Sequence, residues 1–150
     1  MSMTIFLGAD HAGFQLKEKL KVHLQEKGFA VVDMGAFELS PDDDYPDFVR
    51  PVAEAVANDP EHSRGIVVGG SGQGEDNAAD KIQGVRSVVY YGGPLEVVEL
   101  SRKHNNANVL ALGARFLTPE QAMKAVDLWL ATPFEGGRHA KRIEKIDRAT

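Results

Sequence analysis

Residues 65–81 read GIVVGGSGQGEDNAADK, and this stretch decides the fold. Its first five residues form a short apolar run bounded by glycines, as expected of a strand buried on both faces in a parallel sheet. The glycines that follow permit a sharp turn, and the segment beyond Glu75 has helical character. A strand, a glycine-rich turn and a helix in this order indicate an α/β architecture.

The rest of the chain repeats this alternation. Leu16, Leu20 and Leu24 are four residues apart and make one apolar helix face. Thr118 and Gln121 can form a capping box around Pro119 at a helix start. Further strands are predicted over 4–9, 30–33, 86–90 and 109–112, and further helices over 51–57, 94–104 and 119–131. The pattern predicts a Rossmann-like three-layer α/β/α sandwich with a five-stranded parallel sheet, which binds ligands at the carboxyl ends of its strands.

Length and composition narrow the class of protein. The 150 residues suit one domain over 1–150, which we expect to end in a basic helix at about 138–147. A net charge of -5 without a basic run argues against nucleic acid as the main partner, and the absence of cysteine excludes disulfides and thiolate chemistry. There is no signal-peptide pattern and no apolar run that could span a bilayer, so we expect a cytoplasmic protein without membrane partners.

The glycine-rich loop matches neither common nucleotide motif. No Lys follows Gly74, as a P-loop requires, and the third glycine of a dinucleotide fingerprint is replaced by Glu75. A backbone anion site remains possible, and so does a simple tight turn in which Glu75 complements the helix dipole. If the anion is a transient enediolate, Glu75 is the base that creates it, and the loop N–H groups with the Ser71 hydroxyl stabilise it.

Other polar groups are ambiguous when each is considered alone. Asp10 and His11 follow the first predicted strand and could bind a sugar hydroxyl or phosphate, although a helix cap beside a surface histidine is the simpler interpretation. His104 could be a general acid or base, or a histidine that favours a helix C-terminus. We interpret the acidic run Asp42, Asp43 and Asp44 as a solvated turn rather than a metal site, and His23 and His62 as surface residues.

Basic residues occur at two places that suit a phosphate. Arg115 follows the fifth predicted strand, at the edge where ligands bind in this architecture. Arg138 and Arg142 are four apart and share one helix face, next to His139 and Lys141. Without further context, an ordinary solvated basic helix is the preferred interpretation of the last group.

Five motifs in order, GADHAG, DDDYPD, GGSGQGEDNAADK, SRKHNNANVLALGAR and GGRHAKRIEKI, resemble the ribose-5-phosphate isomerase B family. This family also includes galactose-6-phosphate and allose-6-phosphate isomerases, and the similarity covers nearly the whole chain. The resemblance implies a homodimer or dimer of dimers with active sites built from two subunits. It also implies aldose–ketose isomerisation of a sugar phosphate through an enediolate, without a metal or other cofactor.

The resemblance assigns roles by position. It implies Glu75 as the isomerisation base and His104, from the partner subunit, as the group that assists ring opening, together with Asp10. Ser71 would join the loop in holding the enediolate. The substrate-binding residues that it implies are His11, Tyr45, Gly70, Gly72, Gln73, Gly74, Asn105, Arg115, Arg138 and Arg142.

Three departures from the family pattern bear on these expectations. Many members carry a cysteine base where this chain has Gly69, whereas a second branch carries a glutamate where this chain has Glu75. Asp80 replaces a usual asparagine, and the segment YYGGPLE is about two residues longer than in most relatives. We expect ribose 5-phosphate as the substrate, with a six-carbon sugar phosphate as the alternative. A non-catalytic sugar-phosphate sensor is the alternative from another functional class.

Overall fold

The computed structural model describes residues 3–148 and contains a five-stranded sheet in which all neighbouring strands are parallel. The strand order is β2-β1-β3-β5-β4. The strands are β1 (Thr4–Ala9), β2 (Ala30–Asp33), β3 (Ser63–Gly69), β4 (Ser87–Tyr90) and β5 (Val109–Gly113). This arrangement confirms the predicted α/β class and its parallel sheet.

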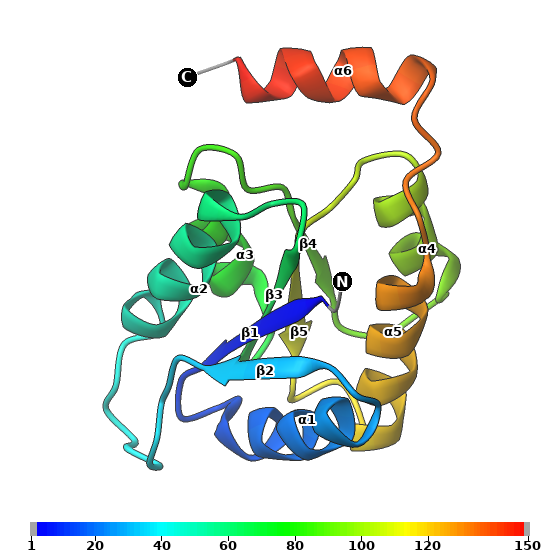
Figure 1. Ribbon diagram of the computed structural model, residues 1–150. Coiled ribbons are helices and arrows are strands. Elements are labelled where there is room, and N and C mark those ends of the chain that lie inside the picture. The colour runs from blue at the N-terminus through cyan, green and yellow to red at the C-terminus, as the bar shows by residue number, and fades with distance from the viewer. Residues whose placement is uncertain (1–2, 149–150) are drawn as a thin grey trace.

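Helices cover both faces of the sheet (Figure 1). One face is covered by α2 (Pro46–Asn58) and α3 (Gln73–Asp80). The other is covered by α1 (Phe14–Glu26), α4 (Glu96–Lys103) and α5 (Pro119–Ala131). The last helix, α6 (Arg138–Asp147), extends beyond the three layers as a separate arm (Figure 1).

The central strands β3 and β5 carry unbroken apolar runs over residues 65–69 and 109–113 because both of their faces are covered. In β3, Ile66 and Val68 pack into the core beneath α1, α4 and α5, whereas Val67 packs into the core beneath α2 and α3. The neighbouring strand β5 alternates in the same way, and Trp129 of α5 is fully buried in the larger core. Burial on both faces explains why the sequence of β3 shows an unbroken apolar run instead of alternation.

The predicted start of α5 is confirmed, whereas the predicted start of α2 is wrong. The Thr118 hydroxyl accepts a hydrogen bond from the Gln121 N–H at 3.1 Å, so the predicted capping box is present at the start of α5. In contrast, α2 begins at Pro46, five residues before the predicted start. Pro51 was expected to begin this helix but lies inside it, where its fixed φ is helical although it cannot donate the backbone hydrogen bond to Asp47.

The topology determines where a ligand can bind. Because β2 and β3 lie on opposite sides of β1, the chain changes direction across the sheet at the boundary between β1 and β3. In open parallel sheets, ligands bind outside the carboxyl ends of the strands at such a switch point. The residues that directly follow β1 and β3 are Asp10 and Gly70, which places both predicted motifs at this position.

The helices that the structure describes are too short or too polar to span a membrane, and one histidine expected at the surface is largely buried. Among residues 3–148, no helix combines the length and apolar character that a membrane span requires. His23 is not the simple surface residue that was expected, because its side chain is 19% exposed and its Nε2 atom lies 2.8 Å from the Asp127 carboxylate. This contact joins α1 to α5 on one face of the sheet.

Candidate active site

The glycine-rich loop crosses the carboxyl ends of β3 and β5. The backbone N–H groups of Ala114 and Arg115 donate hydrogen bonds to the carbonyl oxygens of Gly69 and Gly70, at 2.8 and 3.0 Å. Gly72 has a φ of +82°, and a Cβ atom placed on it would lie only 2.9 Å from the backbone of Leu112. Glycine is therefore required at this turn both by conformation and by space.

Glu75 lies in the first turn of α3 with only 4% of its surface exposed. Its carboxylate sits beside Gly69, in the space that a side chain at position 69 would occupy. Burial raises the pKa of Glu75, the charge of Asp10 acts in the same direction, and the Glu75 backbone N–H acts against them. A buried carboxylate with a raised pKa at a strand end is well suited to remove a proton from a bound substrate.

Asp10 lies near Glu75, and the adjacent His11 is hydrogen-bonded to Asp43. Asp10 accepts hydrogen bonds from the N–H groups of Ala12 and Gly13, at 3.0 and 3.3 Å. The Nδ1 atom of His11 lies 2.8 Å from Asp43 Oδ1, and the His11 N–H donates to the same oxygen at 2.9 Å. The hydrogen bond to Asp43 raises the pKa of His11, against the opposing effect of partial burial.

The interpretation of Asp43 as part of a solvated turn is wrong. It belongs to the acidic run that was interpreted as a solvated turn, yet its side chain is only 11% exposed. Its two hydrogen bonds to His11 hold that imidazole across 32 residues of chain. The signal was present in the sequence only as three adjacent aspartates, and nothing there distinguished the one that folds inward.

Tyr45 and Arg115 approach the loop closely. A Cβ atom on Gly74 would lie 2.6 Å from Cζ of Tyr45, and one on Gly70 would lie 3.0 Å from Cζ of Arg115. Both glycines thus permit a large side chain to pack directly on the loop backbone. Tyr45, the loop, Glu75 and Arg115 consequently form one continuous surface.

Ser71 and Gln73 occupy the turn between the strand and α3. The Ser71 hydroxyl accepts a hydrogen bond from the Gln73 N–H at 3.3 Å, so its own O–H can still donate to an oxygen in the site. Gln73 is exposed at the first position of α3. Ser71 is therefore the better placed of the two to assist an oxyanion.

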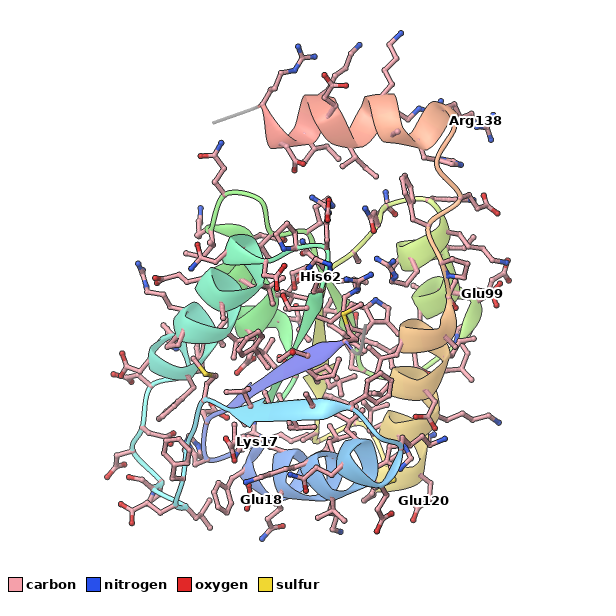
Figure 2. All side chains as sticks on the ribbon, in the orientation of Figure 1. Lys17, Glu18, His62, Glu99, Glu120 and Arg138 are labelled. Atoms are coloured by element: carbon pink, nitrogen blue, oxygen red, sulfur yellow. The ribbon has the colours of Figure 1, made fainter. Side chains whose placement is uncertain are left out.

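The remaining predicted residues lie away from Glu75, towards the opposite edge of the sheet. His104 caps α4, which runs back from the carboxyl edge, and Asn105 follows it near the amino ends of β4 and β5. Arg138 and Arg142 are exposed on the arm α6, and Figure 2 shows Arg138 far from Lys17 of α1. A single chain therefore does not bring His104, Asn105 or the two α6 arginines to Glu75.

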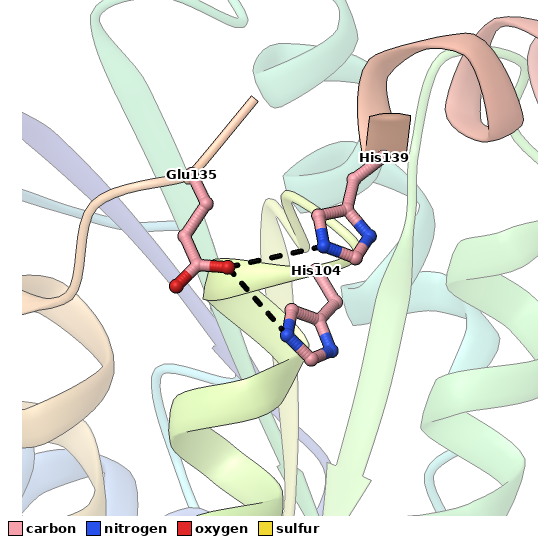
Figure 3. A group of neighbouring side chains, drawn as sticks. All are labelled: His104, Glu135 and His139. Carbon is pink, nitrogen blue, oxygen red and sulfur yellow. Dashed lines mark ion pairs between the residues drawn. The ribbon is translucent and has the colours of Figure 1, made fainter. Parts of the chain in front are cut away.

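His104 belongs to a second cluster, drawn in Figure 3. Its ring stacks on that of His139, with centroids 4.3 Å apart and planes 14° from parallel. The Glu135 carboxylate lies 3.6 Å from Nε2 of His104 and 3.8 Å from Nε2 of His139. Burial lowers the pKa of His139, and the neighbouring His104 adds to this effect.

Two residues that the sequence left without a role have structural partners. Asp80 accepts a hydrogen bond from the N–H of Ser87 at 2.8 Å and so ties the end of α3 to the first residue of β4. Arg102 is buried and donates to the carbonyl oxygens of Thr132 and Ala107, which fixes the chain on both sides of His104. Desolvation of its guanidinium lowers the pKa of Arg102 to about 10.

Comparison with known proteins gives one consistent result. The family described as Ribose/Galactose Isomerase matches residues 5–146. Ribose-5-phosphate isomerase B of Mycolicibacterium paratuberculosis is 42% identical over 143 residues, covering 95% of this chain and 88% of the relative. The crystal structure of ribose-5-phosphate isomerase B from Mycoplasma genitalium with bound ribulose-5-phosphate superposes with a TM-score of 0.94, at 42% identity, covering 99% of this chain and 96% of that one. The corresponding Clostridium thermocellum structure has a TM-score of 0.90 at 43% identity, covering 97% and 95%.

Proposed function

The chain belongs to the ribose/galactose isomerase family, and from this premise we propose that it interconverts ribose 5-phosphate and ribulose 5-phosphate. The observation that carries the proposal is the buried Glu75 carboxylate beside a loop of backbone N–H donors. A base and an oxyanion site side by side are what the formation of an enediolate requires.

Glu75 is the proton carrier in this mechanism. Its carboxylate removes the proton from C2 of the open-chain aldose while the C1 carbonyl oxygen gains negative charge. The N–H groups from Gly70 to Gly74 and the Ser71 hydroxyl stabilise that charge. Protonated Glu75 then returns the proton to C1, while the C2 hydroxyl gives up its proton and the C1 oxygen takes one, so the carbonyl now lies at C2 and the product is the ketose. One carboxylate serves both steps, so the reaction needs no redox cofactor and no metal.

Ring opening and phosphate binding need residues from a second copy of the chain. His104 and Asp10 move the proton that opens the furanose ring, and Asn105 contacts the sugar hydroxyls. Because His104 lies at the opposite edge of the sheet from Glu75, it acts in the site of a partner subunit. The phosphate and the rest of the substrate are bound by His11, Tyr45, Gln73, Arg115, Arg138 and Arg142.

A homodimer is the smallest assembly that completes such sites, and a dimer of dimers would contain two such pairs. The arm α6 extends beyond its own three layers and carries Arg138 and Arg142 (Figure 1). A two-fold axis would place each arm on the other copy and complete two equivalent sites.

The five-carbon substrate is favoured over a six-carbon one by the relatives. The similar proteins are named ribose-5-phosphate isomerase B, and the Mycoplasma genitalium enzyme was crystallised with ribulose-5-phosphate. A panel that includes galactose 6-phosphate and allose 6-phosphate measures this preference directly. We expect the highest kcat/KM with ribose 5-phosphate.

Incubation with ribose 5-phosphate in deuterated water tests the reaction. An isomerase produces the ketose and incorporates solvent deuterium, because Glu75 can exchange its proton with water between the two steps. A non-catalytic sensor would bind the sugar phosphate but leave both its structure and its carbon-bound protons unchanged. That outcome would refute the proposed function.

A further inference from the structure

The cluster of His104, Glu135 and His139 brings three potential metal ligands together. One ligand atom from each residue lies within 4.8 Å of the other two. One carboxylate oxygen of Glu135 lies 3.6 Å from Nε2 of His104 and 3.8 Å from Nε2 of His139. Both distances exceed the hydrogen-bond range, so the carboxylate lies near two imidazoles but forms a hydrogen bond with neither.

These separations are close to those of a zinc site. Zinc binds imidazole nitrogen and carboxylate oxygen at about 2.0–2.1 Å in tetrahedral geometry, which places neighbouring ligand atoms about 3.3 Å apart. The Glu135 oxygen needs to approach each Nε2 atom by only a few tenths of an ångström, although the two rings must also reorient. Two histidines and one glutamate are also a set that zinc uses when its fourth position is open to water.

A second acidic group shows why this cluster is the better candidate. Asp10, His11 and Asp43 also offer three ligand atoms within 4.8 Å. There, however, His11 Nδ1 is 2.8 Å from Asp43, and Asp10 accepts two backbone N–H groups. The atoms His11 Nδ1, Asp43 Oδ1 and Asp10 Oδ1 therefore already have partners that a metal would have to displace, whereas Asp43 Oδ2 is buried without one among residues 3–148.

A backbone hydrogen bond and the burial of one histidine hold the potential ligands near one another. The Glu135 N–H donates to the Lys103 carbonyl oxygen at 3.1 Å, which ties the glutamate to the residue before His104. The His139 side chain is 11% exposed and is the fixed member of the group. His104 and Glu135 are 41% and 51% exposed, which gives them room to adjust.

From this geometry we propose that His104, Glu135 and His139 form a binding site for a Zn²⁺-like transition-metal ion, and that its occupancy inhibits the isomerase. The stacked rings must tilt apart so that both Nε2 atoms point at one ion (Figure 3). A metal-bound Nε2 cannot exchange a proton, so the bound ion removes His104 from ring opening. The inhibitory part of the proposal rests on the function proposed for His104, whereas the binding part does not.

The surrounding positive charge makes the site selective for ions that imidazole binds strongly, and unfavourable for other cations. Lys103 is paired with Glu99 at 2.8 Å, and Arg138 and Arg142 lie on the same helix as His139. These cations disfavour weakly coordinating ions such as Mg²⁺, which depend on net negative charge. Imidazole ligation provides bonds that Zn²⁺ and Co²⁺ form and that Mg²⁺ does not prefer.

Co²⁺ is the probe for binding, because its visible spectrum reports the number and geometry of its ligands. Wild-type protein titrated with Co²⁺ should show the intense bands of a tetrahedral site, and Zn²⁺ should displace them. Glu135→Gln and His139→Phe should each weaken binding at least about tenfold, the lower limit for losing even an outer-shell partner. The phenyl ring of His139→Phe retains the stacking on His104 while removing the ligand nitrogen.

His62→Gln is the matched control, since His62 also forms a histidine–carboxylate pair, with Asp59 at 2.9 Å, but has no third ligand among residues 3–148. It should bind Co²⁺ as the wild type does. Equal Co²⁺ binding by wild type and Glu135→Gln, or a wild type without tetrahedral bands, would overturn the site.

Activity assays test the inhibitory part. Zn²⁺ should inhibit the wild type reversibly, with recovery on addition of EDTA, and Glu135→Gln should keep its metal-free activity while losing at least about tenfold in Zn²⁺ sensitivity. Unchanged sensitivity in Glu135→Gln would refute inhibition through this cluster. If the wild type has no isomerase activity at all, the proposed function fails, but the Co²⁺ spectrum still decides whether the site exists.

Discussion

The carboxylate of Glu75 occupies the space beside Gly69 that a side chain at position 69 would fill. A Cβ atom placed on Gly69 would overlap the carboxylate carbon and both carboxylate oxygens. The two positions therefore cannot both carry a side chain in this conformation. Many relatives in the resembled family carry a cysteine at the position of Gly69, so a thiol there and a carboxylate from position 75 are two ways to place a base in one volume.

Gly69→Ala should therefore abolish most activity by displacing Glu75. We expect turnover to fall by about 10² to 10⁴-fold, the usual contribution of general base catalysis. Gly65→Ala is the matched control on the same strand, because its Cβ would meet the Val52 and Val56 side chains and not the carboxylate. Both variants should unfold at lower urea than wild type. Equal turnover of the two folded variants would show that residue 69 does not control Glu75.

Glu75→Gln should remove proton transfer while retaining the fold. The amide has nearly the same shape as the carboxylate, so substrate binding should persist while kcat falls by about 10² to 10⁴-fold. Deuterium incorporation from solvent should fall in parallel. Asp76→Asn changes the adjacent carboxylate in the same helix turn and should keep most of its turnover. Wild-type turnover in Glu75→Gln would assign the base to another residue.

The pH dependence of activity should reflect the raised pKa of Glu75. The base must be ionised, so kcat/KM should decline on the acid side with a midpoint above 4.5, the ordinary value for this side chain. Burial is the main cause of the shift, followed in the same direction by Asp10. A midpoint at or below 4.5 would contradict the desolvated environment.

The raised pKa of Glu75 should also make the stability of the folded protein depend on pH. Because the pKa of folded Glu75 lies above the unfolded value, the native state binds more protons between the two values, and its stability falls as pH rises through that interval. Glu75→Gln cannot ionise, so the variant should be more stable than wild type at neutral pH. The extra stability of Glu75→Gln should disappear at pH values below both the folded and the unfolded pKa of Glu75. Urea unfolding of both proteins across this pH range measures the difference.

The strands and the glycine loop could be predicted because their signals are local. The run 65–69 has the composition of a doubly covered strand, and Thr118 with Gln121 forms the capping box that their spacing indicates. The start of α2 could not be predicted, because Pro51 normally marks a helix start and here lies inside a helix that begins at Pro46. A tertiary arrangement decided which proline begins the helix.

The candidate site was only partly predictable for a similar reason. Glu75 and Asp10 follow strands that are neighbours in the sheet, and their proximity follows from topology alone. The burial of Asp43 depends on how the segment after β2 folds back onto His11, and three adjacent aspartates carry no local signal of it. The stacking of His104 on His139 depends on the path of α6, which composition does not specify.

Mixing two inactive variants tests whether the sites are shared. Arg138→Ala should raise KM strongly, because it removes a proposed phosphate ligand, whereas Lys145→Ala on the same helix should leave KM unchanged. If Glu75 and Arg138 of one site come from different copies, a Glu75→Gln and Arg138→Ala heterodimer contains one intact site. Random mixing would then restore about a quarter of wild-type activity at low substrate. No recovery after verified subunit exchange would mean that both residues serve the site within one chain.

Breaking the buried ion pair between Lys17 and Asp33 should be strongly destabilising, because it leaves a buried charge without its main partner. Lys17 is fully buried, and its ammonium donates to both Asp33 oxygens at 2.8 and 2.9 Å (Figure 2 shows Lys17). Burial acts to raise the pKa of Asp33, but the hydrogen bonds from Lys17 and from the Gly35 N–H outweigh it and lower that pKa. The stability from this pair is therefore present above the unfolded pKa of Asp33 and is lost as pH falls through the lower folded value.

Lys17→Met should cost about 3 kcal/mol of unfolding free energy, near the lower end for breaking a buried pair, because Lys21 remains 3.3 Å from Asp33. Lys19→Met, on the exposed side of the same helix, should change stability by no more than about 0.5 kcal/mol. Adding Asp33→Asn to Lys17→Met should recover part of the loss, since it removes the buried charge that lost its main partner. Equal urea midpoints for Lys17→Met and Lys19→Met would show that Asp33 tolerates the loss of Lys17 at no cost.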